Sequence, residues 1–405
     1  MLKKVHGLAG WLMMAAFILG PATTSNGQER GERGGVTAQH VTGELKSVDV
    51  KAHAITILST TPGGGGRDGG ERREPVTTEK TFSLAKNAEV AVGTGALSSP
   101  SGRVTGHVAV FKEVKLTELA AGIKVFLALS ADQKTVVSIL AEGPIVKGVL
   151  KAVDATKNTI TLQMPGRGVG RGEAAVAGEE KTYIIAPHAE IATDDGRNTK
   201  FSVKEAKLAD LSQGALVTVR VYVDLKHAQS ILAEGPSHVG TVQAINANKR
   251  TLTLVVRAAR GDDAGEEYHL TVAKDAVVVV DNGKGKLLSA RLAKLDDVPV
   301  GATVAVKLSV DQAHIMSLRA EGATMSAHLK SVDADKGTIT INIPKGRDED
   351  EEKVLSVAKD AHISIDGKSA RLADLKAGEN TLVLRFSLDH QTVESIISRQ
   401  EASRR

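Results

Sequence analysis

Short apolar stretches separated by turn residues run along most of the chain. They are clearest near the C-terminus, where Ile339, Ile341 and Ile343 alternate with threonine and asparagine. A period of two is typical of a β-strand with one buried face. The preceding Asp333-Ala-Asp-Lys-Gly337 favours a tight turn, because aspartate bonds nearby backbone and glycine accepts positive φ. We therefore predict a hairpin whose two strands cover 328–332 and 338–343.

The residues after this hairpin predict further short strands and one helical turn. Leu372-Ala-Asp-Leu375 suits a single α- or 3₁₀-turn, and Gly378 ends it. A charged loop is expected at 345–353, and strands are expected at 354–357, 362–365, 381–388 and 393–397. Five or six short antiparallel strands predict a small barrel or a sandwich. We favour an OB-like barrel, since closure leaves no exposed strand edge.

The same pattern occurs four times, which makes the chain a tandem repeat. Its first marker is a strand ending in Asp or Asn, followed by an Ile/Leu-Thr-Ile/Leu strand. The Asp or Asn positions are 105, 92 and 87 residues apart, at Asp49, Asp154, Asn246 and Asp333. Units of this length are long enough to be separate domains, and solenoid repeats are shorter.

Further markers recur in the same order. One is a Leu-x-x-Leu turn before a glycine, at Leu116–Leu119, Leu208–Leu211, Leu292–Leu295 and Leu372–Leu375. Repeats one to three close with Ala-Glu-Gly, at 141–143, 233–235 and 320–322, whereas repeat four has Ser398 and Arg399. A terminal repeat without a following neighbour is expected to differ. The predicted β-modules are 40–144, 145–236, 237–323 and 324–402.

The N-terminus has the features of a signal peptide. Lys3 and Lys4 precede an apolar run of thirteen residues, Leu8 to Gly20, which is shorter than the roughly 20 residues that span a bilayer. We expect cleavage of residues 1–27, with cleavage after Ser25 as an alternative, and a flexible segment at 28–39. An uncleaved N-terminal anchor is the competing interpretation. The expected location is secreted or periplasmic, in the cell envelope.

Composition limits the candidate functions. The chain has 52 basic and 48 acidic residues, so its net charge stays near zero once Lys3 and Lys4 are removed. Such a balance provides no overall field for nucleic acid or anionic lipid. There is no cysteine, which excludes a disulfide framework, and only 2% of residues are aromatic, which disfavours stacking of bases or sugars. Most aromatic residues alternate with aliphatic ones, and we expect them in the cores.

The recurring carboxylates are candidate metal ligands or catalytic acids, but each lies where a strand meets a turn. Asn246 replaces one of them, which suits a hydrogen-bonding cap and does not suit a general acid. We expect caps at Asp49, Asp154 and Asp333, and in a second set at Asp132, Asp224, Asp311 and Asp389. The acidic run 348–352 is a candidate calcium ligand, although a solvated charge run is the simpler interpretation.

Histidine and serine give no catalytic pattern. The histidines do not recur at one repeat position, apart from His227 and His314, which we expect in turns. A serine does recur, but without a histidine beside it, at Ser138, Ser230, Ser317 and Ser395. No Gly-x-Ser-x-Gly nucleophile motif is present. We therefore predict no enzymatic activity and no catalytic, cofactor or metal site.

Loops between the second and third strands differ most among the repeats. They are rich in glycine, arginine and acids, at 62–74, 165–173, 257–267 and 345–353. No Gly-Lys-Ser/Thr motif opens a helix there, and acids balance the arginines, so a phosphate loop or an RNA-binding segment is not indicated. We expect solvent-exposed hairpin ends. Binding of a metal ion or a polyanion by these loops is the alternative function.

The repeat resembles tandem small β-barrel domains of unknown function that occur in exported bacterial proteins. The residues that carry the resemblance are Gly148 to Asp154, Leu208 to Gly214 and Ser230 to Gly235. It covers nearly all of 40–402 and implies a small barrel and an envelope location, with no activity. The expected function is a non-catalytic spacer or multivalent interaction array. The expected partner is an envelope or extracellular protein or polymer, bound by a monomer that has no membrane span.

Overall fold

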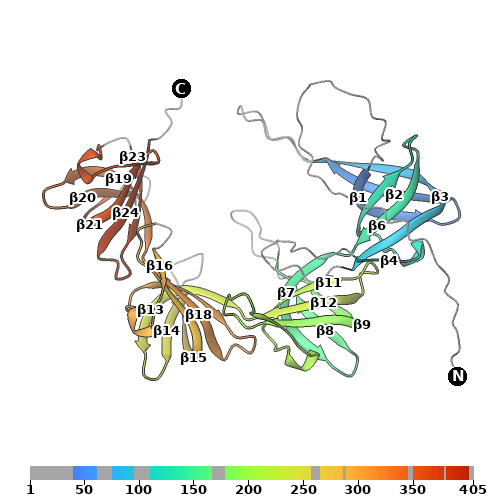
Figure 1. Ribbon diagram of the computed structural model, residues 1–405, viewed down its shortest axis with the longest axis horizontal. Helices are drawn as coiled ribbons and strands as arrows, with labels where there is room; N and C mark the ends of the chain where they lie inside the picture. The colour runs from blue at the N-terminus through green and yellow to red at the C-terminus, as the bar shows by residue number, and fades with distance from the viewer. Residues whose placement is uncertain are drawn as a thin grey trace, which may run out of the picture.

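Four small β-barrels follow one another along an open arc (Figure 1). The computed structural model describes residues 40–61, 75–94, 110–166, 178–256, 265–285, 289–344, 350–377 and 380–400. The expected signal peptide and the segment 28–39 lie outside these residues, as does most of each loop between the second and third strands. In the described part of the chain, no helix is long and apolar enough to cross a membrane.

Barrel 1 shows the topology that all four share. Its sheet has the order β2-β1-β5-β6-β3-β4, and a further pairing of β2 with β3 closes five strands into a barrel. A single 3₁₀ turn, η1, lies between β4 and β5. The elements are β1 (His40–Asp49), β2 (Ala54–Thr61), β3 (Val76–Thr94), β4 (Val110–Glu113), η1 (Leu116–Glu118), β5 (Lys124–Leu129) and β6 (Thr135–Glu142).

The other barrels repeat this order. Barrel 2 comprises β7 (Ile145–Asp154), β8 (Thr159–Gln163), β9 (Glu180–Asp194), β10 (Val203–Glu205), η2 (Leu208–Asp210), β11 (Leu216–Val221) and β12 (His227–Glu234). Barrel 3 comprises β13 (Ser237–Asn246), β14 (Thr251–Val256), β15 (Glu266–Asp281), β16 (Ala290–Leu292), η3 (Leu295–Asp297), β17 (Thr303–Leu308) and β18 (His314–Glu321). Barrel 4 comprises β19 (Thr324–Asp333), β20 (Thr338–Pro344), β21 (Asp350–Ile365), β22 (Lys368–Ser369), η4 (Leu372–Asp374), β23 (Asn380–Phe386) and β24 (Thr392–Gln400).

Each barrel encloses its own aliphatic core, as the alternation predicted. In barrel 4 the core includes Ile339 and Ile341, which are 1% and 0% exposed, while the adjacent Thr338 and Thr340 are only partly buried. Four separate clusters of buried residues correspond to the four barrels. The predicted all-β fold of four tandem OB-like barrels is confirmed, and the barrel is preferred to the sandwich.

One pairing in each barrel is parallel, whereas we predicted an antiparallel barrel. The third strand runs parallel to the last strand, as in the pairs β3–β6, β9–β12, β15–β18 and β21–β24. The reason is the chain connection. After η1 or its equivalent, the next strand pairs antiparallel with the first strand, so the last strand, which follows it in a hairpin, runs in the same direction as the third strand. Counting only the five strands that close the barrel, the order is 1-2-3-5-4 with strand 4 pairing back to strand 1, which is OB-like.

The third strand is also longer than predicted. The expected strands 354–357 and 362–365 are two halves of the single strand β21. The register with β24 changes between Val357 and His362, so the intervening residues bulge where the strand bends around the barrel. Their polar sequence, Ala-Lys-Asp-Ala, resembles a turn. The predicted loop 345–353 is likewise too long, because β21 already begins at Asp350.

The helical turns lie where predicted in three barrels and are displaced in the third. The predicted turn Leu292–Leu295 is wrong, because Leu292 ends β16 and η3 begins only at Leu295. Val298 therefore occupies the place of Leu119, and it is 2% exposed. The Leu-x-x-Leu match at Leu292–Leu295 lies three residues upstream of the true turn, Leu295–Val298, and hid the correct alignment.

Candidate functional site

The first set of recurring carboxylates caps turns. In each barrel a side-chain oxygen at the end of the first strand accepts a hydrogen bond from the backbone N–H three residues later. The donors are Ala52 to Asp49 (2.8 Å), Lys157 to Asp154 (2.9 Å), Lys249 to Asn246 (2.9 Å) and Lys336 to Asp333 (3.0 Å). Asparagine makes the same bond as aspartate, so the position requires an acceptor and no charge. These residues serve the turn, as expected.

The second set of carboxylates caps the hairpin between the last two strands, which we call the plug hairpin. Each accepts from the backbone N–H two residues on, at Asp132 (3.2 Å), Asp224 (2.9 Å), Asp311 (3.1 Å) and Asp389 (3.1 Å). A serine hydroxyl two residues earlier also donates to Asp132, Asp311 and Asp389, and is the main cause of their lowered pKa. Burial raises the pKa of Asp224, but hydrogen bonds from Lys226 and His227 outweigh it.

Plug hairpins of barrels 2, 3 and 4 have a second role, because each inserts its tip into the end of the preceding barrel. Val223, from barrel 2, is fully buried in the core cluster of barrel 1, and its carbonyl accepts a hydrogen bond from the Ala120 N–H (2.9 Å). Val310 packs against the cluster of barrel 2, and Leu388 packs against that of barrel 3. The recurring turn is therefore also a junction.

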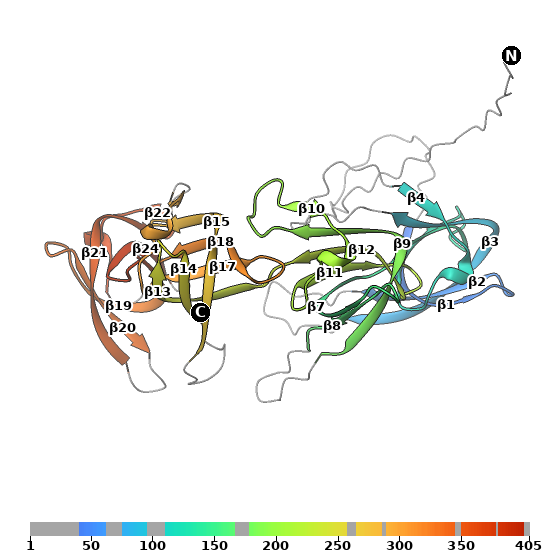
Figure 2. The ribbon, with the colours of Figure 1, turned by 90° about the horizontal axis from the view of Figure 1, so that it is seen from below.

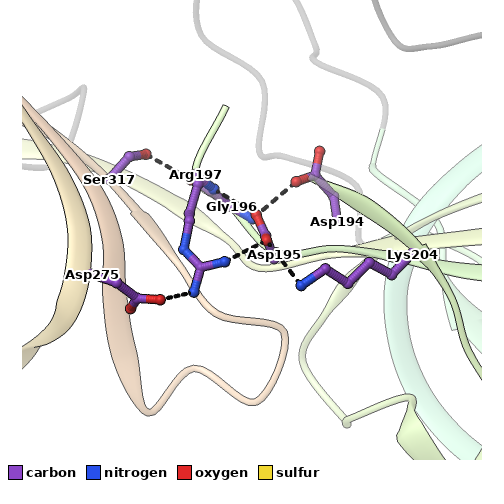
Figure 3. A network of polar contacts seen from close by, with 7 residues as sticks. All are labelled: Asp194, Asp195, Gly196, Arg197, Lys204, Asp275 and Ser317. Carbon is purple, nitrogen blue, oxygen red and sulfur yellow. Dashed lines mark hydrogen bonds and ion pairs between the residues drawn. The ribbon is translucent and has the colours of Figure 1, made fainter. Parts of the chain in front are cut away.

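A second hairpin reaches in the opposite direction. We call the hairpin between β9 and β10, and its equivalent between β15 and β16, the clasp hairpin. Gly196 of the first clasp hairpin accepts a hydrogen bond from the Ser317 hydroxyl of barrel 3 (2.8 Å). The neighbouring Arg197 bridges Asp195 of its own barrel and Asp275 of barrel 3 (Figure 3). At this junction, barrel 2 contacts barrel 3 through its clasp hairpin, and barrel 3 contacts barrel 2 through its plug hairpin.

Two further polar contacts strengthen the junction between barrels 2 and 3. Lys307 forms an ion pair with Glu234 at 2.6 Å, and both side chains are about three-quarters buried. Gln312, at the plug tip of barrel 3, donates from Nε2 to the backbone oxygen of Gln213 (3.0 Å). Partly buried, hydrogen-bonded charges contribute more than exposed ones. This junction is therefore a defined interface and not a flexible link.

The Ala-Glu-Gly marker is explained by close chain crossing at the junctions. A β-carbon at Gly143 would lie 1.8 Å from the Val221 carbonyl oxygen of the next barrel. The distances are 2.0 Å for Gly235 and 1.9 Å for Gly322. No side chain fits there. Two residues at most separate the strands of successive barrels, since β6 ends at Glu142 and β7 begins at Ile145.

The third junction uses the same hairpins, and its equivalents of Ser317 and Gln312 lack hydrogen bonds among the described residues. Lys284 of the clasp hairpin pairs with Asp360 of barrel 4, which corresponds to the pair of Arg197 with Asp275. The hydroxyl of Ser395, in the position of Ser317, is buried without a hydrogen-bond partner among the described residues. The same is true of His390 Nε2, whose residue takes the place of Gln312.

Two of the recurring serines, Ser317 and Ser395, therefore lie at junctions, which the sequence pattern did not reveal. The sequence showed only that Ser138, Ser230, Ser317 and Ser395 recur without a histidine beside them, yet Ser317 binds the preceding barrel. Arg197, Gly196 and Lys284 were also missed, because their partners lie about 80 to 120 residues away in sequence. A signal was present: glycine closes every repeat that has a following neighbour.

Other candidate residues remain dispersed over the surface. His227 Nδ1 lies 2.5 Å from its own turn carboxylate Asp224, and His269 contacts Thr253 on the neighbouring strand. Within the described ranges, no three metal-ligating side chains come together. Glu352, from the acidic run, pairs with Lys330. Aromatic residues are mostly in or against the cores, but Phe201 is 84% exposed and Phe111 is 46% exposed, contrary to expectation.

One apolar hollow lies on the outer surface of barrel 2. It has a volume of about 530 Å³ and is lined by residues of β7, β8, β11 and β12, including Val149 and Leu216, and by residues next to β8, including Met164. Lys147 and Glu234 provide the charged groups at its edge, and Glu234 is already paired with Lys307. The hollow carries no acid–base pair and no nucleophile, so its geometry suits packing of an apolar group only.

No protein-family model matches the chain, and no curated protein matches it. The candidate functional feature therefore rests on the structure alone, and it is the set of junctions between the barrels.

Proposed function

We propose that the protein is exported and acts in the cell envelope as a non-catalytic spacer that presents several surfaces in a fixed arrangement. The observation that carries the proposal is the reciprocal contact of plug and clasp hairpins at the second and third junctions. Such contacts hold neighbouring barrels at a set angle, whereas independent domains on flexible linkers would move freely. The signal-peptide pattern of residues 1–27 supports export.

The arrangement of the hairpins supports multivalent binding. In barrels 2, 3 and 4 the hairpins β8–β9, β14–β15 and β20–β21 extend toward the same side of the arc (Figure 2). Several weak contacts made from one side of a stiff chain give high avidity, because the second contact forms within one complex. An envelope or extracellular protein or polymer with repeated binding positions is the partner that such a chain suits.

Small-angle X-ray scattering of the mature chain tests the spacer. The expected result is one elongated, curved particle whose scattering fits the arc without a conformational ensemble. A compact globe, or a broad ensemble of barrel orientations, would contradict the proposal. Capture of the mature chain's partner from an envelope extract, with cell fractionation alongside, tests location and binding.

A calcium titration separates the spacer from the alternative, a metal- or polyanion-binding module. The spacer predicts no heat of binding and an unchanged melting temperature at millimolar Ca²⁺. Binding that stabilises the fold would raise the melting temperature through mass action. The pairing of Glu352 with Lys330 favours the spacer, because part of the acidic run is already neutralised.

A further inference from the structure

The faces at the two ends of the array differ from the internal faces at the positions that make the junctions. Barrel 1 is the first barrel in the described part of the chain. At the tip of its plug hairpin stands Ala131, where barrels 2, 3 and 4 have Val223, Val310 and Leu388. Those three side chains pack into the preceding barrel, whereas Ala131 is exposed. The free plug hairpin thus lacks its apolar tip.

Barrel 1 also lacks the basic residue of the junction. The residue opposite the recurring serine is Lys307 in barrel 3 and Arg385 in barrel 4, and both lie at a junction. Strand register places Arg220 in the same position in barrel 2, opposite Ser230. In barrel 1 this position is Ala128, opposite Ser138. Both positions, the plug tip and the residue opposite the serine, are therefore alanine in barrel 1.

Barrel 4 differs at the opposite face. Eight residues separate β9 from β10 and β15 from β16, which lets these clasp hairpins reach the next barrel. In barrel 4, only Asp366 and Gly367 separate β21 from β22. Gln400 stands where the other barrels have the glycine that admits the next chain crossing. Barrel 4 therefore lacks both the long clasp hairpin and the closing glycine that a following barrel would need.

From these differences we infer that the contact face between barrels is a self-recognition surface, and that the chain has removed it from both ends. Its partner is the neighbouring barrel of the same chain, which has an apolar plug tip and a basic residue on the strand before the last; a glycine closes the barrel that receives it. A second copy of the chain does not fit. The array of four barrels therefore does not associate head to tail, whatever it binds.

The test uses the full mature chain. Light scattering at increasing concentration is expected to give the monomer mass throughout, whereas association of the unaltered chain would overturn the inference. Val223→Ala gives barrel 2 the short tip of barrel 1. It is expected to broaden the scattering-derived ensemble and increase the radius of gyration. Ala131→Val is the matched control, and it is expected to change neither shape nor melting temperature.

Two outcomes with these variants would count against the inference. Unchanged scattering from both Val223→Ala and the second tip variant, Val310→Ala, would show that tips do not hold the barrels. In the double variant Ala128→Arg/Ala131→Val only the first face is restored, so the chain is expected to remain a monomer. Head-to-tail dimers of this variant would show that barrel 4 still accepts a partner. Circular dichroism checks that each variant is folded.

Discussion

At the scale of single residues, the closing glycines make the tightest contacts between barrels. Gly235 lies directly under the carbonyl of Leu308, and a methyl group there would overlap this oxygen. The obstacle is backbone, which moves less readily than the end of a side chain. Glycine is needed here for close approach, since neither Gly143, Gly235 nor Gly322 has a positive φ.

Gly235→Ala is therefore expected to weaken the junction between barrels 2 and 3 by about 1–3 kcal/mol, the usual cost of overpacking. The measurement is the lowest-temperature transition in differential scanning calorimetry. Gly93→Ala is the control, because a β-carbon at Gly93 would meet nothing within 4 Å. Equal effects of the two substitutions would show that backbone freedom, and not the chain crossing, explains the glycine.

Glu394 provides a pH-dependent prediction at the same scale. Burial beneath the clasp hairpin of barrel 3 raises its pKa, and its Oε2 has no partner in the described part of the chain. A raised carboxyl pKa means that the folded state favours the protonated form, so stability is present at low pH and lost as the pH rises through the folded pKa.

Glu394→Gln is accordingly expected to raise the melting temperature at pH 7, and the gain is expected to shrink as the pH falls to about 4. Melting curves of both proteins from pH 4 to pH 8 measure this. Glu352→Gln is the control, since Glu352 has a partner in Lys330 and is exposed. A gain that persists at pH 4 would mean that charge burial is not the cause.

At the scale of elements, the clasp hairpin depends on one arginine. Arg197 is about three-quarters buried and reaches a carboxylate in each of two barrels, Asp195 and Asp275. Lys204 approaches Asp195 as well, at 3.5 Å, but it lies within barrel 2 and is 62% exposed. The two cations therefore share a carboxylate, and only one of them crosses the junction.

Arg197→Ala is expected to speed hydrogen exchange in residues 194–199 and to weaken the junction by roughly 1 kcal/mol. Lys204→Ala is expected to leave that exchange near the unaltered rate. Exchange followed by mass spectrometry on the full chain gives both results. If both variants exchange alike, the ion pair to Asp275 does not hold the hairpin.

Strands and turns could be predicted where they depend on local sequence. Alternation of apolar and polar residues predicted the strands around Asp333, and Asn246 showed that the recurring turn position needs only a hydrogen-bond acceptor. The single strand β21 was not predictable, because its bend is filled by polar residues that equally suit a turn. The junctions were not predictable either, since the hydroxyl of Ser317 meets Gly196 only once two barrels are packed.

At the scale of the whole molecule, the second and third junctions are built from equivalent positions and differ in polar contacts. Between barrels 2 and 3, Ser317, Gln312 and Lys307 all bind the preceding barrel. At the third junction, Ser395 and His390 take the first two places and have buried polar atoms without partners in the described residues. Such atoms lose solvation without a compensating bond, which weakens the packed state.

The arc is therefore expected to bend more between barrels 3 and 4 than between barrels 2 and 3. The chain has no cysteine, so spin labels attach only where cysteines are introduced. Lys181→Cys with Lys274→Cys reports on barrels 2 and 3, and Lys274→Cys with Lys359→Cys reports on barrels 3 and 4. Pulsed electron paramagnetic resonance is expected to give a narrower distance distribution for the first pair.

His390→Gln should provide at the third junction the hydrogen bond that Gln312 makes at the second, and so narrow the distance distribution between barrels 3 and 4. Equal widths in the unaltered background would mean that the tip packing of Val310 and Leu388, and not the polar contacts, sets the stiffness of the arc.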